Sequence, residues 1–317
     1  MDINKLAALR ELAVRKTMTE VAKNLHLSPS AVSQQIAQLE EEVGIDLTER
    51  RGRGVELTIA GQRLVEHANR IFTELESARA EMSHLKKAVA GKIRVAAFPS
   101  VAAALMPATF GALKKSHPML QIQFDELEPE ESLTAIRGWQ TDIALIDDLN
   151  TPEGLLDAGI GIIPLMEDLF HVVLPPQHPL ADKKRITFAE LKDENWVIDT
   201  ASMTYTDMLT KACVKAGFMP NIVAKCKGFE VTIALVRGGC AIAILPELRA
   251  KMELEGALVR RVYPEIRRKI FVVYRKSEKK SPSVKAFLTA LYEQSVILKC
   301  GSFGSESEAF IQHLLLN

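Results

Sequence analysis

The stretch SPSAVSQQIAQLEEEVG, residues 28–44, decides the fold of the first part of the chain. Ser28 can cap the N-terminus of a helix, and Pro29 suits the first helical turn, where a missing N–H removes no hydrogen bond. Apolar side chains then recur with the spacing of one buried helix face, at Val32, Ile36 and Leu39. The stretch therefore predicts a helix that packs this face against a core.

The outward face of the same helix is uncharged. It carries the hydrogen-bonding side chains Ser30, Ser33, Gln34, Gln35 and Gln38. The preceding segment TMTEVAKNLHL, residues 17–27, predicts another short helix, because Thr17 and Glu20 have the spacing of a capping box. Two helices with so short a connection suit a helix-turn-helix, whose second helix reads base edges through a narrow polar face. A plain pair of packed helices with a polar surface fits the same residues.

Arginines gather around two glycines in the next segment, ERRGRGVELT, residues 49–58. With the strand-like VEL, this predicts a β-hairpin, or wing, whose Arg50, Arg51 and Arg53 hold DNA phosphates. A solvated run of charge is the alternative. Residues 1–60 contain eight basic and nine acidic side chains, so binding to DNA requires the basic ones to gather on one face.

A seven-residue repeat occupies residues 58–92. Apolar residues step alternately by four and three positions, at Leu64, Ala68, Ile71, Leu75, Ala78, Met82, Leu85 and Val89. Such a seam predicts a long helix that pairs with another helix, and the same helix of a second copy is the nearest partner. We therefore expect a homodimer, with Gly91 ending the helix. A long helix packed on its own chain is the alternative.

Residues 18–64, MTEVAKNLHLSPSAVSQQIAQLEEEVGIDLTERRGRGVELTIAGQRL, resemble the LysR-type transcriptional regulator family. The likeness lies in the SAVS recognition helix, the arginine before the wing and the LTIAG sequence that leads into a linker helix, and it extends to about residue 297. Two positions depart from the family pattern: Gln34 stands where arginine is common, and Thr48 replaces the usual phenylalanine. The resemblance implies a homodimer or homotetramer on double-stranded promoter DNA. The expected DNA contacts are Ser28, Ser30, Ser33, Gln34, Gln35, Arg50, Arg51 and Arg53.

The remaining two-thirds of the chain alternates short apolar strands with helical segments. Strands are expected at residues 93–98, 122–127, 142–147, 171–175, 196–199, 222–226, 241–246 and 270–275. Such alternation predicts an α/β architecture in which crossover helices join parallel strands. The resemblance implies two α/β subdomains similar to periplasmic solute-binding proteins, with chain crossovers near residues 164–168 and 267–269.

The expected fold class is thus α plus α/β. A winged helix-turn-helix domain occupies residues 1–60, a coiled-coil dimerisation linker helix 61–91, and an effector-binding domain 92–297. Within the last, subdomain I comprises about 92–165 and 269–297, and subdomain II about 166–268. Residues 298–317 form a C-terminal extension for which the family pattern gives no guide.

Ligands of open α/β sheets bind beyond the carboxyl ends of strands, near helix N-termini. Loops in such positions match the family's effector pocket and supply the candidates Pro99, Ser100, Val101, Glu128, Thr200, Ser202, Met203, Thr204 and Phe229. Ser100 and Ser202 match best, with helix capping as the alternative for each. The loops suggest a partly apolar ligand and show no arginine clamp for an anion.

Other classes of protein find little support. No spaced set of catalytic residues or metal ligands occurs, so we expect neither an enzyme nor a metal or cofactor. No run approaches the roughly 18 apolar residues of a membrane-spanning helix, and the N-terminus lacks a secretory apolar core. A cytoplasmic protein without a membrane partner is expected.

The main hypothesis is a DNA-binding transcriptional regulator whose promoter binding changes when a small-molecule effector occupies the cleft between the two subdomains. One alternative is a solute-binding or enzymatic α/β protein whose N-terminal helices serve only for assembly. Another is a regulator switched by thiol oxidation at Cys226 and Cys240, which end one expected strand and precede another.

Overall fold

The structure, a computed structural model, describes residues 1–25, 27–51, 54–85, 89–137, 139–149, 159–200, 203–250, 254 and 256–298. The chain divides into two compact units, residues 1–87 and 88–317. Arg53, Ser202 and the extension beyond Leu298 lie outside the described residues.

The first unit has the predicted helix-turn-helix. Its elements are α1 (Ile3–Arg15), α2 (Met18–Leu25), α3 (Pro29–Val43), β1 (Thr48–Arg51), β2 (Gly54–Leu57) and α4 (Ile59–Leu85). The Ser28 hydroxyl accepts a hydrogen bond from the backbone N–H of Ala31 at 3.1 Å and so caps α3. The side chains of Val32, Ile36 and Leu39 are at most 2% exposed and pack against α1 and α2, as the sequence predicts.

The wing is an antiparallel hairpin. In it Thr48 pairs with Leu57 and Arg51 with Gly54. One Glu40 carboxylate oxygen, at the end of α3, fixes the start of β1: it accepts the backbone N–H of Leu47, the backbone N–H of Thr48 and the Thr48 hydroxyl, each at 2.9 Å. The threonine that departs from the family pattern is therefore a hydrogen-bond donor in this chain.

The apolar residues of the seven-residue repeat in α4 lie in two different environments. Leu64 and Ala68 pack into the core of the first unit, where Ala68 is fully buried. Farther along, Ile71 is 39% and Leu75 36% exposed. The described helix ends at Leu85, and Val89 packs in the second unit, so the predicted continuation to Val89 is wrong.

The second unit begins with β3 (Gly91–Ala97), α5 (Pro99–Ser116), β4 (Leu120–Glu126), α6 (Pro129–Arg137), β5 (Ile143–Asp147) and β6 (Ile160–Leu174). Next come β7 (Arg185–Thr187), η1 (Phe188–Leu191), β8 (Asn195–Asp199), α7 (Met203–Lys215), β9 (Asn221–Cys226), α8 (Phe229–Arg237) and β10 (Ala243–Pro246). The last elements are α9 (Glu247–Ala250), β11 (Leu258–Tyr263), β12 (Arg267–Arg275), η2 (Lys276–Lys280) and α10 (Pro282–Leu298).

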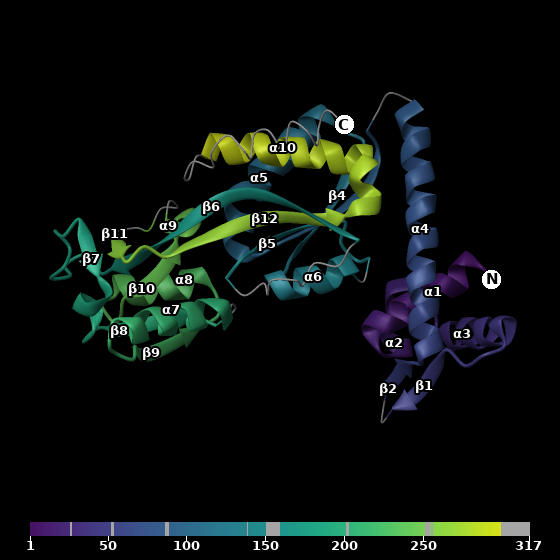
Figure 1. The fold of residues 1–317 in the computed structure, drawn as a ribbon, viewed down its shortest axis with the longest axis horizontal. Helices are drawn as coiled ribbons and strands as arrows, with labels where there is room; N and C mark the ends of the chain where they lie inside the picture. Colours follow the sequence, from purple (N-terminus) through teal and green to yellow (C-terminus); the bar gives the residue numbers. More distant parts are fainter. Residues whose placement is uncertain are drawn as a thin grey trace. The chain divides into compact units, whose positions relative to one another are not determined.

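Two long strands tie the second unit together. The main sheet has the order β4-β3-β5-β12-β6-β11-β7, with β10 also paired to β6. Strands β6 and β12 run side by side from subdomain I, which contains β3 to β5 with α5, α6 and α10, into subdomain II, which contains β7 to β11 with α7 and α8 (Figure 1). The crossovers predicted near residues 164–168 and 267–269 lie on these two strands.

The sheet is mixed, which corrects the expectation of parallel strands. The pairs β3 with β4, β3 with β5 and β7 with β11 are parallel, as is the separate two-stranded sheet of β8 and β9. Strand β12, however, is antiparallel to β5 and β6, and β6 is antiparallel to β10 and β11. The reason is that the chain crosses between the subdomains along β6 and returns along β12. The short strands β7 and β11 were not predicted.

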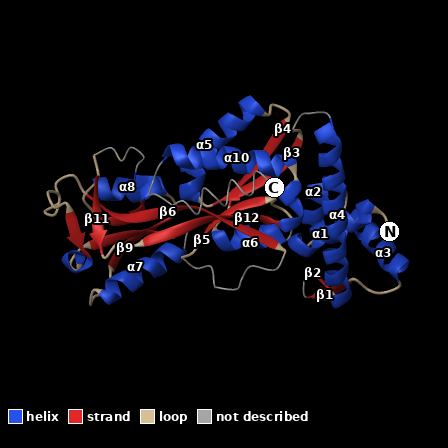
Figure 2. Cartoon of the chain, turned by 45° about the horizontal axis from the view of Figure 1, so that its top comes forward, coloured by secondary structure: helices blue, strands red, loops and turns tan. Residues whose placement is uncertain are grey.

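Subdomain I buries its sheet on both faces. Helices α5 and α10 cover one face and α6 the other (Figure 2). Ile143 and Leu145 of β5 therefore pack in one core, and Ala144 and Ile146 pack in the other. Burial on both faces explains why β5 is a continuous apolar run. Within the described part of the chain, no helix is long and apolar enough to cross a membrane.

Candidate functional site

The outward face of α3 presents part of the predicted polar set. Ser30, Ser33 and Gln34 are exposed. Gln35 is half-buried, and its Oε1 atom is buried without a hydrogen-bond partner among the described residues. The Ser28 hydroxyl lies 2.9 Å from that of Ser30 while it caps the helix. Ser33 and Gln34 are thus open to a ligand, Ser30 is exposed with its hydroxyl beside that of Ser28, and Gln35 is only partly exposed.

Two of the three predicted phosphate-binding arginines lie on the hairpin. Arg50 and Arg51 lie on β1, in register with Val55 and Gly54 of β2. The acidic end of α3 is directed elsewhere: Glu42 pairs with Lys5 at 2.6 Å and with the N-terminal amine at 3.0 Å, and Glu40 binds the start of β1. Neighbouring groups thus engage these two carboxylates of α3.

A cleft lies where the two subdomains meet on β6 and β12. Its lining comprises Phe98, Pro99, Ser100, Glu128, Pro129, Asp147, Asp199, Tyr205, Phe229, Leu245, Pro246, Arg249 and Arg268. The residues from Phe98 to Asp147 belong to subdomain I, whereas Asp199, Tyr205 and Phe229 belong to subdomain II. The cleft contains a small cavity of about 30 Å³.

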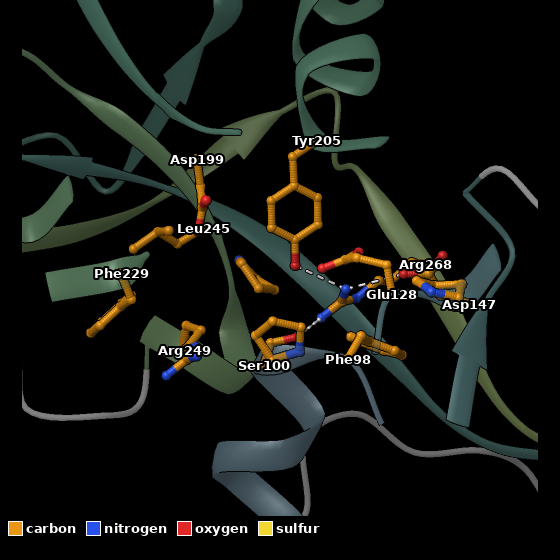
Figure 3. Close-up of a pocket in the computed structure, with 13 residues that line it drawn as sticks. Phe98, Ser100, Glu128, Asp147, Asp199, Tyr205, Phe229, Leu245, Arg249 and Arg268 are labelled. Carbon is orange, nitrogen blue, oxygen red and sulfur yellow. Dashed lines mark hydrogen bonds and ion pairs between the residues drawn. The ribbon is translucent and has the colours of Figure 1, made fainter. Parts of the chain in front are cut away.

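Arg268 of β12 lies in the centre of this cleft. Its guanidinium donates to Ser100 Oγ at 2.7 Å in subdomain I and to the Tyr205 hydroxyl at 2.9 Å in subdomain II. It also donates to Asp168 at 2.6 and 3.0 Å and to Asp147 at 3.2 Å. Figure 3 shows Tyr205 and Ser100 approaching the guanidinium from opposite sides. One side chain therefore connects both subdomains.

Because Arg268 is buried, its charge needs these ion pairs and hydrogen bonds. Arg268 is 1% exposed, and an isolated charge in such a place would be very costly unless carboxylates and hydrogen-bond acceptors surrounded it. Aromatic rings complete its surroundings: Phe98 lies 4.8 Å, Phe170 5.4 Å and Tyr205 5.7 Å from the guanidinium carbon. The centre of the cleft is thus a cage for a cation.

The cage also shifts the acidity of its members. Burial raises the pKa of Asp147 above its ordinary value, although the nearby Arg268 guanidinium works in the opposite direction. Burial likewise raises the pKa of Tyr205, so its phenol stays protonated at neutral pH. Arg268, and not an ionised Tyr205, is therefore the charge that both subdomains share.

The predicted effector residues divide into three groups. Pro99, Ser100, Glu128 and Phe229 line the cleft. Val101 does not, because the first turn of α5 points it into the core, where it is fully buried. Thr200 lies off the lining and donates its hydroxyl to the Cys226 carbonyl at 3.0 Å. Met203 and Thr204 begin α7, but their side chains are not among those that the structure describes. Ser202 lies outside the described residues.

Ser100 lines the cleft but does not have the alternative role of helix capping. Its hydroxyl accepts from Arg268 and is 3% exposed, so it does not cap α5. Phe98 occupies the cap position and makes no capping hydrogen bond through its side chain. The serine is therefore part of the cage around Arg268.

Sequence reasoning missed several residues of the site, among them Arg268, Asp168, Tyr205 and Arg249. A signal for Arg268 was present: it alternates with Ile266 and Ile270, so a strand places a charged residue on an apolar face. The structure buries Arg268 and Ile270 and exposes Arg267 and Lys269 on the other side of the strand. The partner Ser100 is 168 positions away, a pairing that no local pattern reveals.

A second hollow lies apart from the cleft. Its volume is about 330 Å³, and its lining is mainly apolar but includes two lysines: Leu149, Met208, Lys211, Ala212, Lys215, Ala216, Pro264 and Ile266. It is larger than the cleft, but it lacks convergent polar groups from two subdomains. Specific small-molecule sites usually combine an apolar lining with a few such groups, so the cleft is the stronger candidate.

The described cysteines lie outside the cleft lining. Cys213, Cys226 and Cys240 are all free thiols. Cys213 is fully buried, and burial raises its thiol pKa to about 11, which keeps it protonated and unreactive. Cys226 is half-buried and Cys240 is exposed.

A winged helix-turn-helix unit followed by a two-subdomain unit with a cleft defines a class of ligand-responsive DNA-binding regulators. Residues 3–62 match the family of bacterial regulatory helix-turn-helix proteins of the lysR family, and residues 86–295 match the LysR substrate binding domain. The chain belongs to the LysR family.

Curated relatives that are transcriptional regulators match this chain along most of their length. The transcriptional dual regulator GltC of Bacillus subtilis is 25% identical over 296 residues, which cover 90% of this chain and 95% of GltC. The DNA-binding transcriptional dual regulator OxyR of Escherichia coli is 26% identical over 280 residues, 87% of this chain and 90% of OxyR.

Solved structures share the fold. A variant of full-length OxyR from Pseudomonas aeruginosa matches with a TM-score of 0.70 at 21% identity, covering 93% of this chain and 94% of that one. Full-length CbnR in complex with its target DNA matches with a TM-score of 0.59 at 20% identity, covering 93% of this chain and all of CbnR.

Proposed function

We propose that this LysR-family regulator binds double-stranded promoter DNA through α3 and the wing, and that a small-molecule effector in the cleft changes this binding. The single observation that carries the effector part is the Arg268 bridge, because it ties the closure of the cleft to one cluster of side chains. An effector can shift the balance between two arrangements only if it binds one of them better. A ligand that rearranges the bridge has that property.

We assign a function to each domain, with boundaries close to those expected from the sequence. Residues 1–60 bind DNA, α4 beyond residue 60 dimerises, and residues 92–297 bind the effector, with the extension 298–317 unassigned. Bases are contacted by Ser30, Ser33, Gln34 and Gln35, and phosphates by Arg50, Arg51 and Arg53, with Ser28 also among the DNA-binding residues. The exposure of Ser30, Ser33 and Gln34 supports this assignment. The effector residues are those of the cleft together with Met203 and Thr204, which begin α7, and with Ser202, which lies outside the described residues.

Fluorescence anisotropy with the purified full-length protein tests DNA binding. A fragment of the DNA upstream of its own coding sequence should bind about 10³-fold more tightly than a scrambled fragment, and the affinity should fall steeply with salt. Replacing Gln34 with Ala should cost about 1–3 kcal/mol on the native fragment and relax the sequence preference, because a base contact is lost. Equal affinity of the wild-type protein for both fragments would contradict the proposed function.

Gln38 provides the matched control. It is the same residue type, is exposed on the same helix, and lies one turn farther from the N-terminal end that enters the groove. Gln38→Ala should leave the preference between the two fragments nearly unchanged. If Gln34→Ala weakens both fragments equally, Gln34 does not read a base.

We also propose that the exposed part of the α4 seam pairs with a second copy of the chain. Ile71 and Leu75 are large apolar side chains with more than a third of their surface exposed, and they continue a seam whose first members are buried. Changing both to Asp should reduce the mass of the assembly about twofold in sedimentation velocity, since charged side chains at a helical seam oppose pairing. Glu74→Gln, between them on an exposed position, is the control. An unchanged mass would place the dimer contact elsewhere.

A further inference from the structure

We infer that the second hollow, which lies between α7 and the connection from β11 to β12, is a binding site for a small molecule that joins an anionic group to an apolar body. This site is separate from the cleft and goes beyond the proposed function. The inference rests on the apolar walls of the hollow, on its size and on two lysines of one helix.

The walls of the hollow are the apolar edge of the core of subdomain II. Leu149, Met208, Ala212, Ala216 and Ile266 all line the hollow and pack against that core. An apolar group placed on such a surface removes it from water, and this is the main driving force for the binding of apolar groups. The hollow therefore favours a ligand with an apolar body.

The size of the hollow suits a small organic molecule. A protein cavity of about 150 Å³ can hold benzene, and the hollow measures about 330 Å³. This volume accommodates an aromatic ring with a short chain. A protein partner is a poorer fit, because stable protein interfaces use about 20–30 residues on each side, whereas eight residues line the hollow.

The walls are held in place without a ligand. The backbone N–H of Leu149 donates to the Asp147 carboxylate at 3.2 Å, and the Ile266 carbonyl accepts the backbone N–H of Phe170 at 2.9 Å. The remaining wall belongs to the regular helix α7. A preformed site spares the ligand the cost of ordering its walls. Binding therefore requires no rearrangement of these segments.

Two lysines determine the charge of the hollow. Lys211 and Lys215 are the only titratable side chains among the described residues that line it. They are four positions apart on α7, a spacing that brings Cβ atoms to about 5–6 Å, so both ammonium groups can reach one anion. Both side chains are exposed, and neither forms an ion pair within the described part of the chain.

Carboxylates next to the lining residues in the sequence form no ion pair with these lysines. Asp148 accepts the backbone N–H of Lys269 at 2.8 Å, and Glu265 binds Arg267 at 2.6 Å. Asp207 of α7 is exposed and forms no ion pair with the lysine four positions later. Like charges at this spacing on a helix repel each other. An anion between the two ammonium groups relieves the repulsion, so the hollow prefers a negative charge.

Isothermal titration of the full-length protein near pH 7 tests the inference with 4-phenylbutyrate and 4-phenylbutylamine. These probes share an aromatic ring on a short chain and differ in the sign of their charge. Phenylbutyrate should bind about tenfold more tightly, because the two lysines attract the anion and repel the ammonium. Acetate has the charge without the apolar body, and it should show no binding at millimolar concentration.

Variants of α7 locate the bound molecule. Lys211→Gln and Lys215→Gln should each weaken phenylbutyrate about threefold, the effect of one exposed ion pair, and the double variant about tenfold. Ala212→Phe places a ring in the hollow and should remove binding. Lys225→Gln, at an exposed position on β9 outside the lining, is the matched control and should bind like the wild-type protein. The unfolding midpoint from tryptophan fluorescence shows that each variant is folded, because Trp196 packs in the same core.

Equal or tighter binding of the amine, or no binding of phenylbutyrate at millimolar concentration, would overturn the inference. Binding of phenylbutyrate that is unchanged in both the double lysine variant and Ala212→Phe would also overturn it, because the molecule would then occupy another site, such as the cleft. The DNA titration tests the proposed function separately, since these variants change no residue of α3, the wing or the cleft.

Discussion

Replacing Arg268 with Met should lower the free energy of unfolding of the second unit by about 3–5 kcal/mol, the usual cost of removing one partner from a buried ion pair. The side chain of Arg268 is fully buried, as is that of Asp168, and Asp147 is 5% exposed. Methionine fills part of the volume but offers no donor. The two carboxylates, Ser100 and Tyr205 would lose their shared partner at once.

Urea unfolding followed by tryptophan fluorescence measures this loss. The chain has two tryptophans, Trp139 and Trp196, and both lie in the second unit, so the signal reports that unit in the full-length protein. Arg267→Met is the matched control: Arg267 is adjacent on β12, is half-exposed, and pairs with Glu167 and Glu265 at the surface. Its loss should change the unfolding midpoint little, because water screens such pairs.

The defect should also depend on pH. In the variant, burial acts on Asp147 without the opposing guanidinium, so its pKa in the folded state rises further above the unfolded value. The folded variant then binds more protons than the unfolded chain, and its stability falls as the pH rises through this range. The deficit relative to the wild-type protein should therefore be larger at pH 8 than at pH 5. A deficit that is the same at both pH values, or no deficit, would show that Arg268 does not hold buried carboxylate charge.

The local fold could be predicted from the sequence where short-range patterns determine it. The capping serine at 28, the apolar face of α3 and the glycine-flanked arginines each act within a few residues, and the structure confirms the helix and hairpin that they predict. The antiparallel pairing of β12 could not be predicted in this way, because the direction of a strand depends on where the chain returns after crossing to the other subdomain.

The cleft shows the same limit more sharply. Ser100 and Phe229 could be found because each follows a strand and begins a helix, a position that marks ligand loops in α/β sheets. Arg268 lies inside a strand. It is the centre of the site because the fold brings it into contact with Ser100, which is 168 positions away in the sequence. A buried charge on an apolar strand face is a local signal that some partner exists, but its identity depends on tertiary structure.

Loss of the Glu40 carboxylate, which binds the start of β1, should have a large effect on the stability of the first unit. Replacing Glu40 with Ala should destabilise the start of the wing by about 2–3 kcal/mol, since one charged acceptor of three hydrogen bonds is removed. Leu47 is fully buried, so its backbone N–H would be left without a partner away from water. Thr48 would lose both its backbone and side-chain acceptor.

Hydrogen exchange of the full-length protein, read by mass spectrometry, measures this effect at the affected amides. Peptides that contain Leu47 and Thr48 should exchange faster in Glu40→Ala, whereas peptides from the second unit and the tryptophan unfolding curve should stay unchanged. Glu40→Gln, which keeps an acceptor oxygen but not the charge, should restore part of the protection. Glu41→Ala, one position along on the exposed face of α3, is the control and should exchange like the wild-type protein.

Because Arg50 and Arg51 lie on β1, a loosened strand should also bind the native DNA fragment more weakly. Unchanged exchange at Leu47 and Thr48 would mean that Glu40 does not couple α3 to the wing.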